Sequence, residues 1–150
     1  MDALDQEAAG LLSAALRHTR DAESLLVSST DQAVHLAGYG PECARKATLS
    51  PRWLHPVLGH LLGVEAEPLL QFAQAVDPAA ARYQIVDWAA RYPRLVSWNP
   101  QARYRQTGTF RREDAVQLVK EARSVVDNLV TSLWCDGRVP DDFLRRELSP

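Results

Sequence analysis

The stretch FRREDAVQLVKEARSVVDNLVTSLW, residues 110–134, decides the fold class of this chain. Its apolar side chains recur at intervals of three and four residues, which is the period of an amphipathic α-helix. Thr109 is placed to cap the start of this helix, and Gly137 follows its end. We therefore expect one long helix here and, because no segment shows a convincing alternating strand pattern, an all-α protein around it.

The first third of the chain predicts two more helices. Residues 4–27 repeat the helical period, and polar turn formers at 28–31 allow a second helix over residues 31–48. Small residues at positions 33, 37, 40, 44 and 47 share one face of this second helix, so we expect it to lie centrally in a bundle. Pro41 cannot donate a backbone hydrogen bond, which predicts a kink at Gly40–Pro41.

The middle of the chain is richer in proline and glycine. Residues 50–68 read as a loop with one short helix, and helices are expected over residues 66–76 and 78–91. The last of these would place Ala81, Ile85, Trp88 and Ala89 on one face. Residues 92–109 read as irregular, with an extended piece at 94–98. The predicted architecture is an up-and-down bundle of four to five helices in a single domain, residues 1–150.

Composition narrows the functional class. The chain has 46% hydrophobic and 24% charged residues and a net charge of -2, which is typical of a globular protein and excludes a strongly basic duplex-binding protein. The absence of a long apolar run or a basic, apolar start predicts a cytoplasmic protein without membrane contact. No common enzyme motif, metal-ligand spacing or cofactor-binding loop occurs, so no metal and no cofactor are expected.

Three segments carry a resemblance to a known family. Residues 35–47 read HLAGYGPECARKA, similar to the "LAGY..EC..KA" segment of bacterial HEPN-domain proteins. Residues 20–26, RDAESLL, are similar to the "DAE.LL" stretch of the family's first helix. Trp98-Asn99-Pro100 and Arg103-Tyr104-Arg105 resemble the "W.p..RYR" segment before its last long helix.

The resemblance implies a HEPN-like helical bundle that commonly dimerises. It also implies a bacterial toxin–antitoxin or defence-type module, a minimal nucleotidyltransferase as protein partner, and activities from RNA or nucleotide binding to metal-independent RNA cleavage. Catalytic members resemble one another in an Arg with a His a few residues further on, near the last core helix. Here His18, His35, His55 and His60 all precede that helix. The prediction is therefore RNA or nucleotide binding, with cleavage left open.

The candidate ligand-binding residues lie in an acid-free stretch before the last helix. Arginine binds phosphate oxygens in pairs, and a tyrosine between two arginines can stack on a base. The alternative is a solvated basic turn, partly neutralised by the acidic residues that follow it. The residues are Arg103, Tyr104, Arg105, Arg111 and Arg112, followed by Glu113 and Asp114.

Glu42 and Lys46 complete the predicted ligand-binding set. Their spacing of four predicts a helical ion pair. Alternatively, Glu42 orients Arg103 or Arg105, and we expect Arg103 to project toward the second helix near Glu42. His35 shares a helix face with Tyr39 and Glu42 and is the best acid–base candidate. The candidate catalytic residues are thus His35, Glu42 and Arg103.

A different class of function fits the same sequence. A non-catalytic, dimerising protein-interaction module would use the small-residue helix and exposed apolar surface to dock a partner.

Overall fold

The computed structural model describes residues 2–62 and 65–148, and within them the protein is all-α, as predicted, with no strand. The number of helices is larger than predicted, because proline and glycine break the middle of the chain into short pieces. The elements are α1 (Gln6–Leu25), α2 (Thr30–Ala37), α3 (Tyr39–Ala47), α4 (Leu54–Leu58), α5 (Ala66–Val76), η1 (Pro78–Tyr83), α6 (Trp88–Arg91), η2 (Leu95–Ser97), η3 (Pro100–Tyr104), α7 (Arg112–Cys135) and α8 (Asp141–Leu148).

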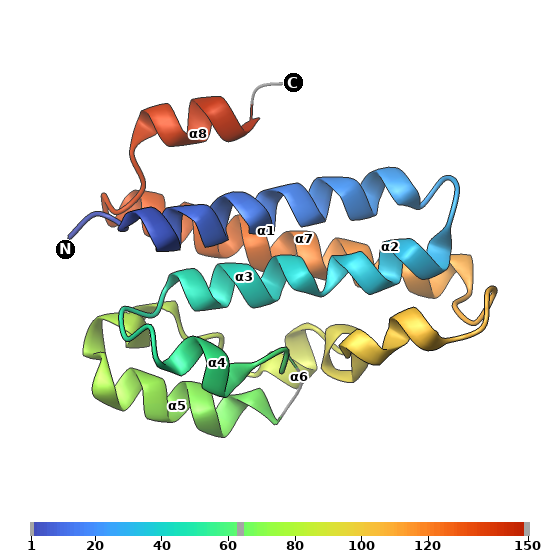
Figure 1. Ribbon diagram of the computed structural model, residues 1–150, viewed down its shortest axis with the longest axis horizontal. Coiled ribbons are helices and arrows are strands. Elements are labelled where there is room, and N and C mark those ends of the chain that lie inside the picture. Colours follow the sequence, from blue (N-terminus) through green and yellow to red (C-terminus); the bar gives the residue numbers. More distant parts are fainter. Residues whose placement is uncertain (1, 63–64, 149–150) are drawn as a thin grey trace.

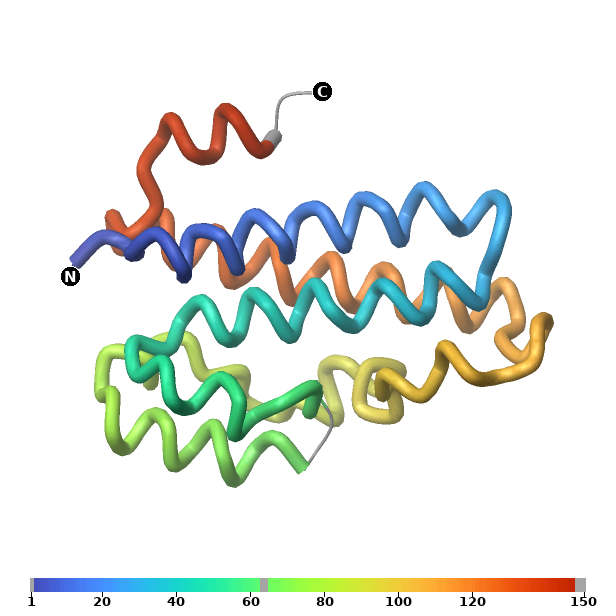
Figure 2. Tube along the Cα trace, viewed as in Figure 1, coloured from blue at the N-terminus to red at the C-terminus, as the bar shows by residue number. Residues whose placement is uncertain are grey.

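Three long rods form the centre of the molecule. The chain runs out along α1, back along α2 and α3, and back again along α7, and these rods contact one another along their length (Figure 1). Between α3 and α7 the chain returns through the short pieces α4 to η3, which cover one side of the bundle (Figure 2). None of the helices in residues 2–62 and 65–148 has the length and apolar character that a membrane span needs.

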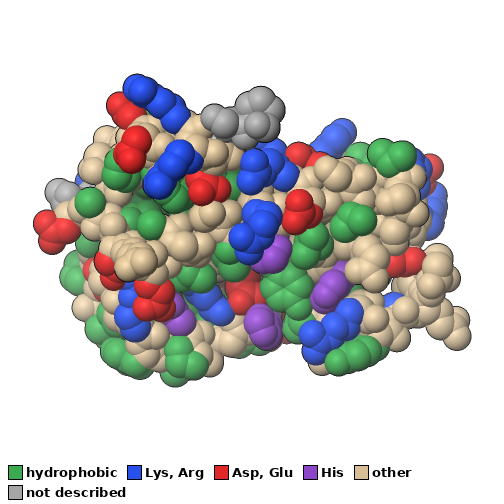
Figure 3. Space-filling model, turned by 45° about the horizontal axis from the view of Figure 1, so that its top comes forward, with side chains coloured by type: hydrophobic (Ala, Val, Ile, Leu, Met, Phe, Trp, Pro, Cys, Tyr) green, Lys and Arg blue, Asp and Glu red, His purple; other side chains and the backbone are tan. Residues whose placement is uncertain are grey.

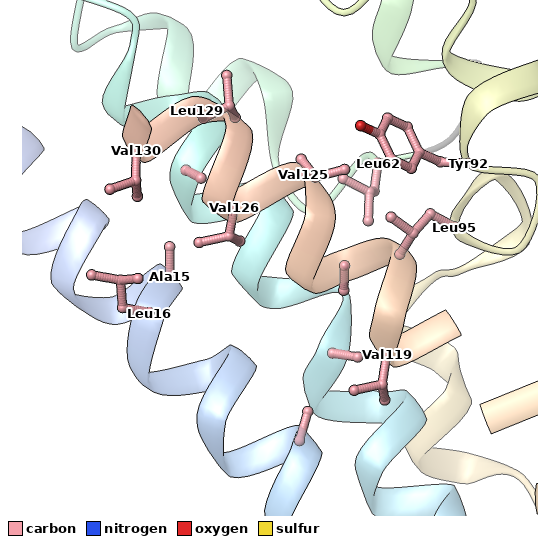
Figure 4. Close-up of a cluster of buried hydrophobic side chains, with 14 of the residues drawn as sticks. Ala15, Leu16, Leu62, Tyr92, Leu95, Val119, Val125, Val126, Leu129 and Val130 are labelled. Carbon is pink, nitrogen blue, oxygen red and sulfur yellow. The ribbon is translucent and has the colours of Figure 1, made fainter. Parts of the chain in front are cut away.

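The helix predicted from residues 110–134 forms, and it supplies more residues to the main core than any other described helix. Val126 and Val130 of α7 point toward Ala15 and Leu16 of α1, whereas Val125 lies on the side of the short helical pieces (Figure 4). The buried apolar residues of α7 are Ala115, Leu118, Val119, Ala122, Val125, Val126, Leu129, Val130 and Leu133.

The sequence predicted the C-terminal end of α7 correctly but not its N-terminal cap. Gly137 follows its end with a φ of 68°, as the sequence predicted. The expected cap at Thr109 is wrong, because the N-cap position is Arg111 and the Thr109 hydroxyl donates to the Gln106 carbonyl instead.

The second predicted helix is two helices, and the break lies at Gly38 rather than at Gly40–Pro41. Pro41 has no N–H for the carbonyl of Ala37, so α2 ends there and Pro41 falls in the first turn of α3, where a missing N–H costs nothing. The predicted central position of the small-residue face is confirmed, because Ala33, Ala37, Gly40, Ala44 and Ala47 are all buried.

The helix predicted over residues 78–91 is wrong. The chain forms η1 and α6 instead, separated by a turn in which Asp87 has a φ of 54°. Trp88 is buried, but Ala81 and Ala89 are exposed, so the predicted apolar face does not exist. The piece at 94–98 is not extended either, because residues 95–97 form η2.

Candidate functional site

Tyr39, the first residue of α3, is the centre of an aromatic cluster. The rings of His35, His60 and His18 lie 5.3, 5.7 and 5.8 Å from the Tyr39 ring, centroid to centroid. Trp98 packs edge-on against the same ring at 5.1 Å. Figure 3 shows histidine side chains gathered on this face beside acidic and basic ones. Four separate segments of the chain therefore meet at one partly exposed tyrosine.

The break at Gly38 makes this cluster possible. A Cβ atom at position 38 would overlap the indole ring of Trp98, so only glycine lets that ring approach α2 and α3. The Trp98 indole N–H then donates to the Val34 carbonyl at 2.8 Å, a bond that fixes the ring against α2. On the other side, Gly40 packs closely against Thr19, which brings α1 and its neighbouring residue His18 up to Tyr39.

Glu42 holds His60 in a fixed orientation. The His60 Nδ1 atom lies 3.1 and 3.0 Å from the two carboxylate oxygens of Glu42. An ionised carboxylate only accepts hydrogen bonds, so Nδ1 carries the proton and Nε2 of the neutral ring is left with a free lone pair. The Glu42 side chain is 5% exposed and the His60 side chain 61% exposed, so a buried carboxylate orients a histidine that solvent reaches.

Lys46 forms the predicted ion pair with Glu42, at 2.7 Å. Its ammonium group also donates to the Gly59 carbonyl at 2.5 Å, next to His60. Lys46 is mostly buried, like Glu42. We therefore interpret Lys46 and Glu42 as residues that position His60, and a ligand would reach the exposed His60 ring first.

His18 and His35 favour the neutral form. Burial lowers the pKa of His18, and the positive charge of Arg17 lowers it further. Burial likewise lowers the pKa of His35, with a further contribution from Arg103. The Nδ1 atoms of both rings are buried and have no hydrogen-bond partner among the described residues. Neutral imidazoles at this site are able to accept a proton.

Arg103 lies on the same side of the molecule as the histidines. Its charge lowers the pKa of His35 and opposes the increase that burial causes in the pKa of Tyr39. Glu42 also acts on Tyr39, but Arg103 forms no ion pair with Glu42, and its guanidinium lies over the Tyr104 ring at 4.8 Å. Arg103 is therefore not held by an ion pair with Glu42, although the charges of both residues act on Tyr39.

The four arginines of the predicted cluster separate into two pairs. Arg111 pairs with Glu113 at 2.9 Å, and Arg112 donates to the Leu26 carbonyl at 2.9 Å. Arg103 and Arg105 have neither an ion pair nor a hydrogen bond from their side chains to any described residue, and both are exposed. The solvated-turn interpretation fits the first pair, and an open phosphate-binding position fits the second.

Glu121 of α7 places the segment that carries Trp98. This carboxylate is 6% exposed and accepts from the backbone N–H groups of Arg94 and Leu95, at 2.9 and 3.1 Å. Sequence reasoning missed Glu121, because nothing in the helical pattern distinguishes a buried glutamate from the exposed acidic residues of the same helix.

Two cavities lie on either side of residues 97–99. One, of about 310 Å³, includes His60 and Pro100 in its wall. The other, of about 260 Å³, includes Arg105 and Phe110. His60 and Arg105 therefore line two different cavities, and residues 97–99 contribute to the walls of both.

The sequence identified part of this site. His35, Glu42 and Arg103, the candidate catalytic residues, all surround Tyr39, while Arg111 and Arg112 are engaged elsewhere. His18 and His60 were missed. For His18, the sequence carried one signal: the small-residue face of the second helix predicts that another helix packs closely against it. For His60 it carried none, because the position of this residue depends on the path of a loop.

Within the described residues, no group of three or more histidine, cysteine, aspartate or glutamate side chains is arranged to hold a metal ion. Comparison of the chain with protein-family models, with curated proteins and with solved structures gave no match. The residues whose chemistry suits a functional site form the Tyr39 cluster, which we define as Tyr39, His18, His35, His60, Glu42, Trp98 and Arg103.

Proposed function

We propose that this protein binds RNA or a nucleotide at the Tyr39 cluster, as the HEPN-like component of a bacterial toxin–antitoxin or defence-type module. The observation that carries the proposal is the pair of exposed arginines, Arg103 and Arg105, whose guanidinium groups have no acidic partner among the described residues. Such groups are available for phosphate oxygens, which arginine binds through two parallel hydrogen bonds.

The exposed aromatic ring next to them supports the same proposal. Tyr104 is 71% exposed and lies under the Arg103 guanidinium. An exposed ring beside a free cation offers a base a surface for stacking and its phosphate a counter-charge, and this combination tolerates many sequences. A minimal nucleotidyltransferase remains the protein partner that the family resemblance suggests.

The histidines extend the proposal to metal-independent RNA cleavage. In that reaction a base removes the proton of a ribose 2'-hydroxyl, the oxygen attacks the adjacent phosphorus, and the 5'-oxygen of the next nucleotide leaves with a proton from an acid. His60, with Nδ1 held by Glu42, presents Nε2 for the first proton transfer. His60 then carries that proton on Nε2 and gives it to the leaving 5'-oxygen. Arg103, whose charge acts on the neighbouring His35, is the cation that would offset negative charge on the phosphate.

The test is binding and cleavage of a fluorescent single-stranded RNA by the purified protein in the presence of a metal chelator. The Arg103→Ala/Arg105→Ala variant should bind at least about tenfold more weakly at low salt, because two phosphate contacts are lost. The matched control is Arg111→Ala/Arg112→Ala, which removes the same charge from arginines already engaged. Equal loss in both variants would show that only net charge matters.

Cleavage is tested separately from binding. His60→Ala should abolish metal-independent cleavage while RNA affinity changes little, because His60 is a proton-transfer group in this proposal. Binding without cleavage by the wild type would leave a binding protein and reject the catalytic role.

Exposed apolar side chains favour a second candidate, the protein-interaction module. Trp53, Val57, Leu61, Phe72 and Val76, around α4 and α5, are each 42% to 54% exposed, and the Trp53 and Phe72 rings are 6.3 Å apart. Large exposed apolar patches are typical of docking surfaces. A stable dimer by analytical ultracentrifugation that Trp53→Ser/Phe72→Ser converts to a monomer, together with no RNA binding, would favour this function.

A further inference from the structure

We propose that the cavity beside Arg105 binds one unpaired nucleobase, so that the ligand is a single-stranded nucleic acid whose base enters the protein. This proposal rests on the proposed nucleic-acid binding. It adds that the protein recognises a base and that the nucleic acid has to be single-stranded.

The walls of the cavity suit a flat apolar ring. Its buried lining comes from Val34 of α2, Trp98 and Ala102, and Leu118 of α7, with Phe110 half-buried at one side. Two aromatic side chains and three aliphatic ones thus form an apolar wall on which a base can pack.

The rim of the cavity is polar and carries a positive charge. Asn99, Thr109 and Arg105 line the same cavity and are exposed, so they lie where it opens to solvent. Among the residues that the structure describes, no acidic side chain lines this cavity. A base inside would therefore leave its phosphate next to the free guanidinium of Arg105.

The volume of the cavity is sufficient for one base. The cavity measures about 260 Å³, below the range of roughly 300–1,000 Å³ typical of sites that enclose whole small molecules. A paired base inside a duplex cannot enter, because its edge and both faces are already engaged. A single-stranded nucleic acid offers a base that fits the cavity and is not paired.

The cavity is built before any ligand arrives. The Asp31 carboxylate accepts from the backbone N–H groups of Gly108 and Phe110, at 2.6 and 3.2 Å, and so fixes the turn that carries Thr109 and Phe110. Trp98 is fixed by its bond to Val34. A preformed wall reduces the ordering that binding requires.

The test compares two fluorescent single-stranded RNAs that differ only in the loss of their bases. Wild-type protein should bind the base-containing RNA about 5- to 150-fold more tightly than the abasic one, the range expected for stacking of a base in an aromatic site. The cavity-filling variant Ala102→Leu should reduce binding of the base-containing RNA by a similar factor and leave abasic binding unchanged. Ala89→Leu, the same change at an exposed position of α6, is the matched control.

The outcomes separate the two proposals. Equal wild-type affinity for both RNAs, or no effect of a folded Ala102→Leu variant, would overturn the base-binding cavity while leaving phosphate binding at Arg103 and Arg105 intact. Failure of the wild type to bind either RNA would overturn the proposed function as well. If Ala102→Leu does not fold, Thr109→Leu, which adds bulk at the exposed rim of the same cavity, takes its place in this comparison.

Discussion

A single added methyl group at position 38 would meet the indole ring of Trp98, and the Tyr39 cluster depends on that approach. We expect Gly38→Ala to lower the free energy of unfolding by about 1–3 kcal/mol or more, because overpacking in a closed contact forces the ring or the backbone to move. Urea unfolding followed by circular dichroism measures this change.

Gly10 provides the control for that substitution. It lies within α1 with open space around its Cβ position, so Gly10→Ala should raise stability by about 0.5–1 kcal/mol through helix propensity. If both substitutions destabilise the protein equally, helix geometry and not the Trp98 contact explains the effect.

Three half-buried histidines predict a pH dependence of stability. The pKa values of His18, His35 and His55 are lowered below the ordinary 6.5, in each case mainly by burial. The unfolded chain then binds more protons than the folded one as pH falls through 6.5, so stability is full above that value and decreases below it. We expect a lower free energy of unfolding at about pH 5.5 than at about pH 7.5.

A variant assigns this effect to the site. His18→Gln/His35→Gln should weaken the dependence between these two pH values, leaving the part due to His55. The carboxylates with lowered pKa, Asp5 and Asp136, titrate below 3.8 and do not contribute in this window. An unchanged pH dependence in the variant would contradict the neutral, buried state of the two rings.

At the scale of single residues, the sequence predicted contacts between residues that are close in the chain but not contacts between distant ones. The Glu42–Lys46 pair follows from a spacing of four on one helix and is present. The Glu42–His60 contact joins residues 18 positions apart across a loop. No periodic pattern encodes it, because it depends on where the chain turns after α4.

At the scale of elements, Glu121 connects α7 to the segment that carries Trp98. Glu121→Ala would leave the N–H groups of Arg94 and Leu95 without their acceptor, so we expect a loss of about 2 kcal/mol or more in unfolding free energy. Glu121→Gln should lose less, because its amide oxygen still accepts. Thermal and urea unfolding measure both.

Glu113→Ala, on the same helix, is the control. Glu113 is exposed and pairs only with exposed Arg111, so its removal should cost less than about 1 kcal/mol. Equal losses at positions 113 and 121 would contradict the role of Glu121 in holding this segment. A weaker RNA affinity of Glu121→Gln would link the segment to binding.

The elements with a strong apolar period were predictable, and the short ones were not. The long run of apolar positions in residues 110–134 leaves one face that must be buried, and α7 forms there. Over residues 78–91 two short turns replaced the expected helix, because Asp87 adopts a left-handed conformation and Tyr83 and Trp88 find buried positions separately. Tertiary packing overrides local preference in such short segments.

At the scale of the whole molecule, the site exists only in the folded chain. Its side chains come from α1, α2, α3, the loop after α4 and the segment around residues 98–105, and the bundle brings them to one face. Sequence analysis could therefore name His35, Glu42 and Arg103 as candidates but not the tyrosine around which they gather.

Salt dependence tests the same face as a phosphate-binding surface. If Arg103 and Arg105 each contact a phosphate, the logarithm of RNA affinity should fall with the logarithm of salt concentration, and Arg103→Ala/Arg105→Ala should make the slope shallower by about 1–2. Fluorescence anisotropy over a salt series measures both slopes. A slope unaltered by the double substitution would assign the phosphate contacts to other residues.

The most direct test of the central claim is an NMR titration of isotope-labelled protein with a short single-stranded RNA. Binding at the Tyr39 cluster predicts saturable shifts of the His35, His60 and Tyr39 ring signals and of the Arg103 and Arg105 side chains. Shifts confined to the apolar side chains around α4 and α5, or no saturable shifts at all, would contradict it.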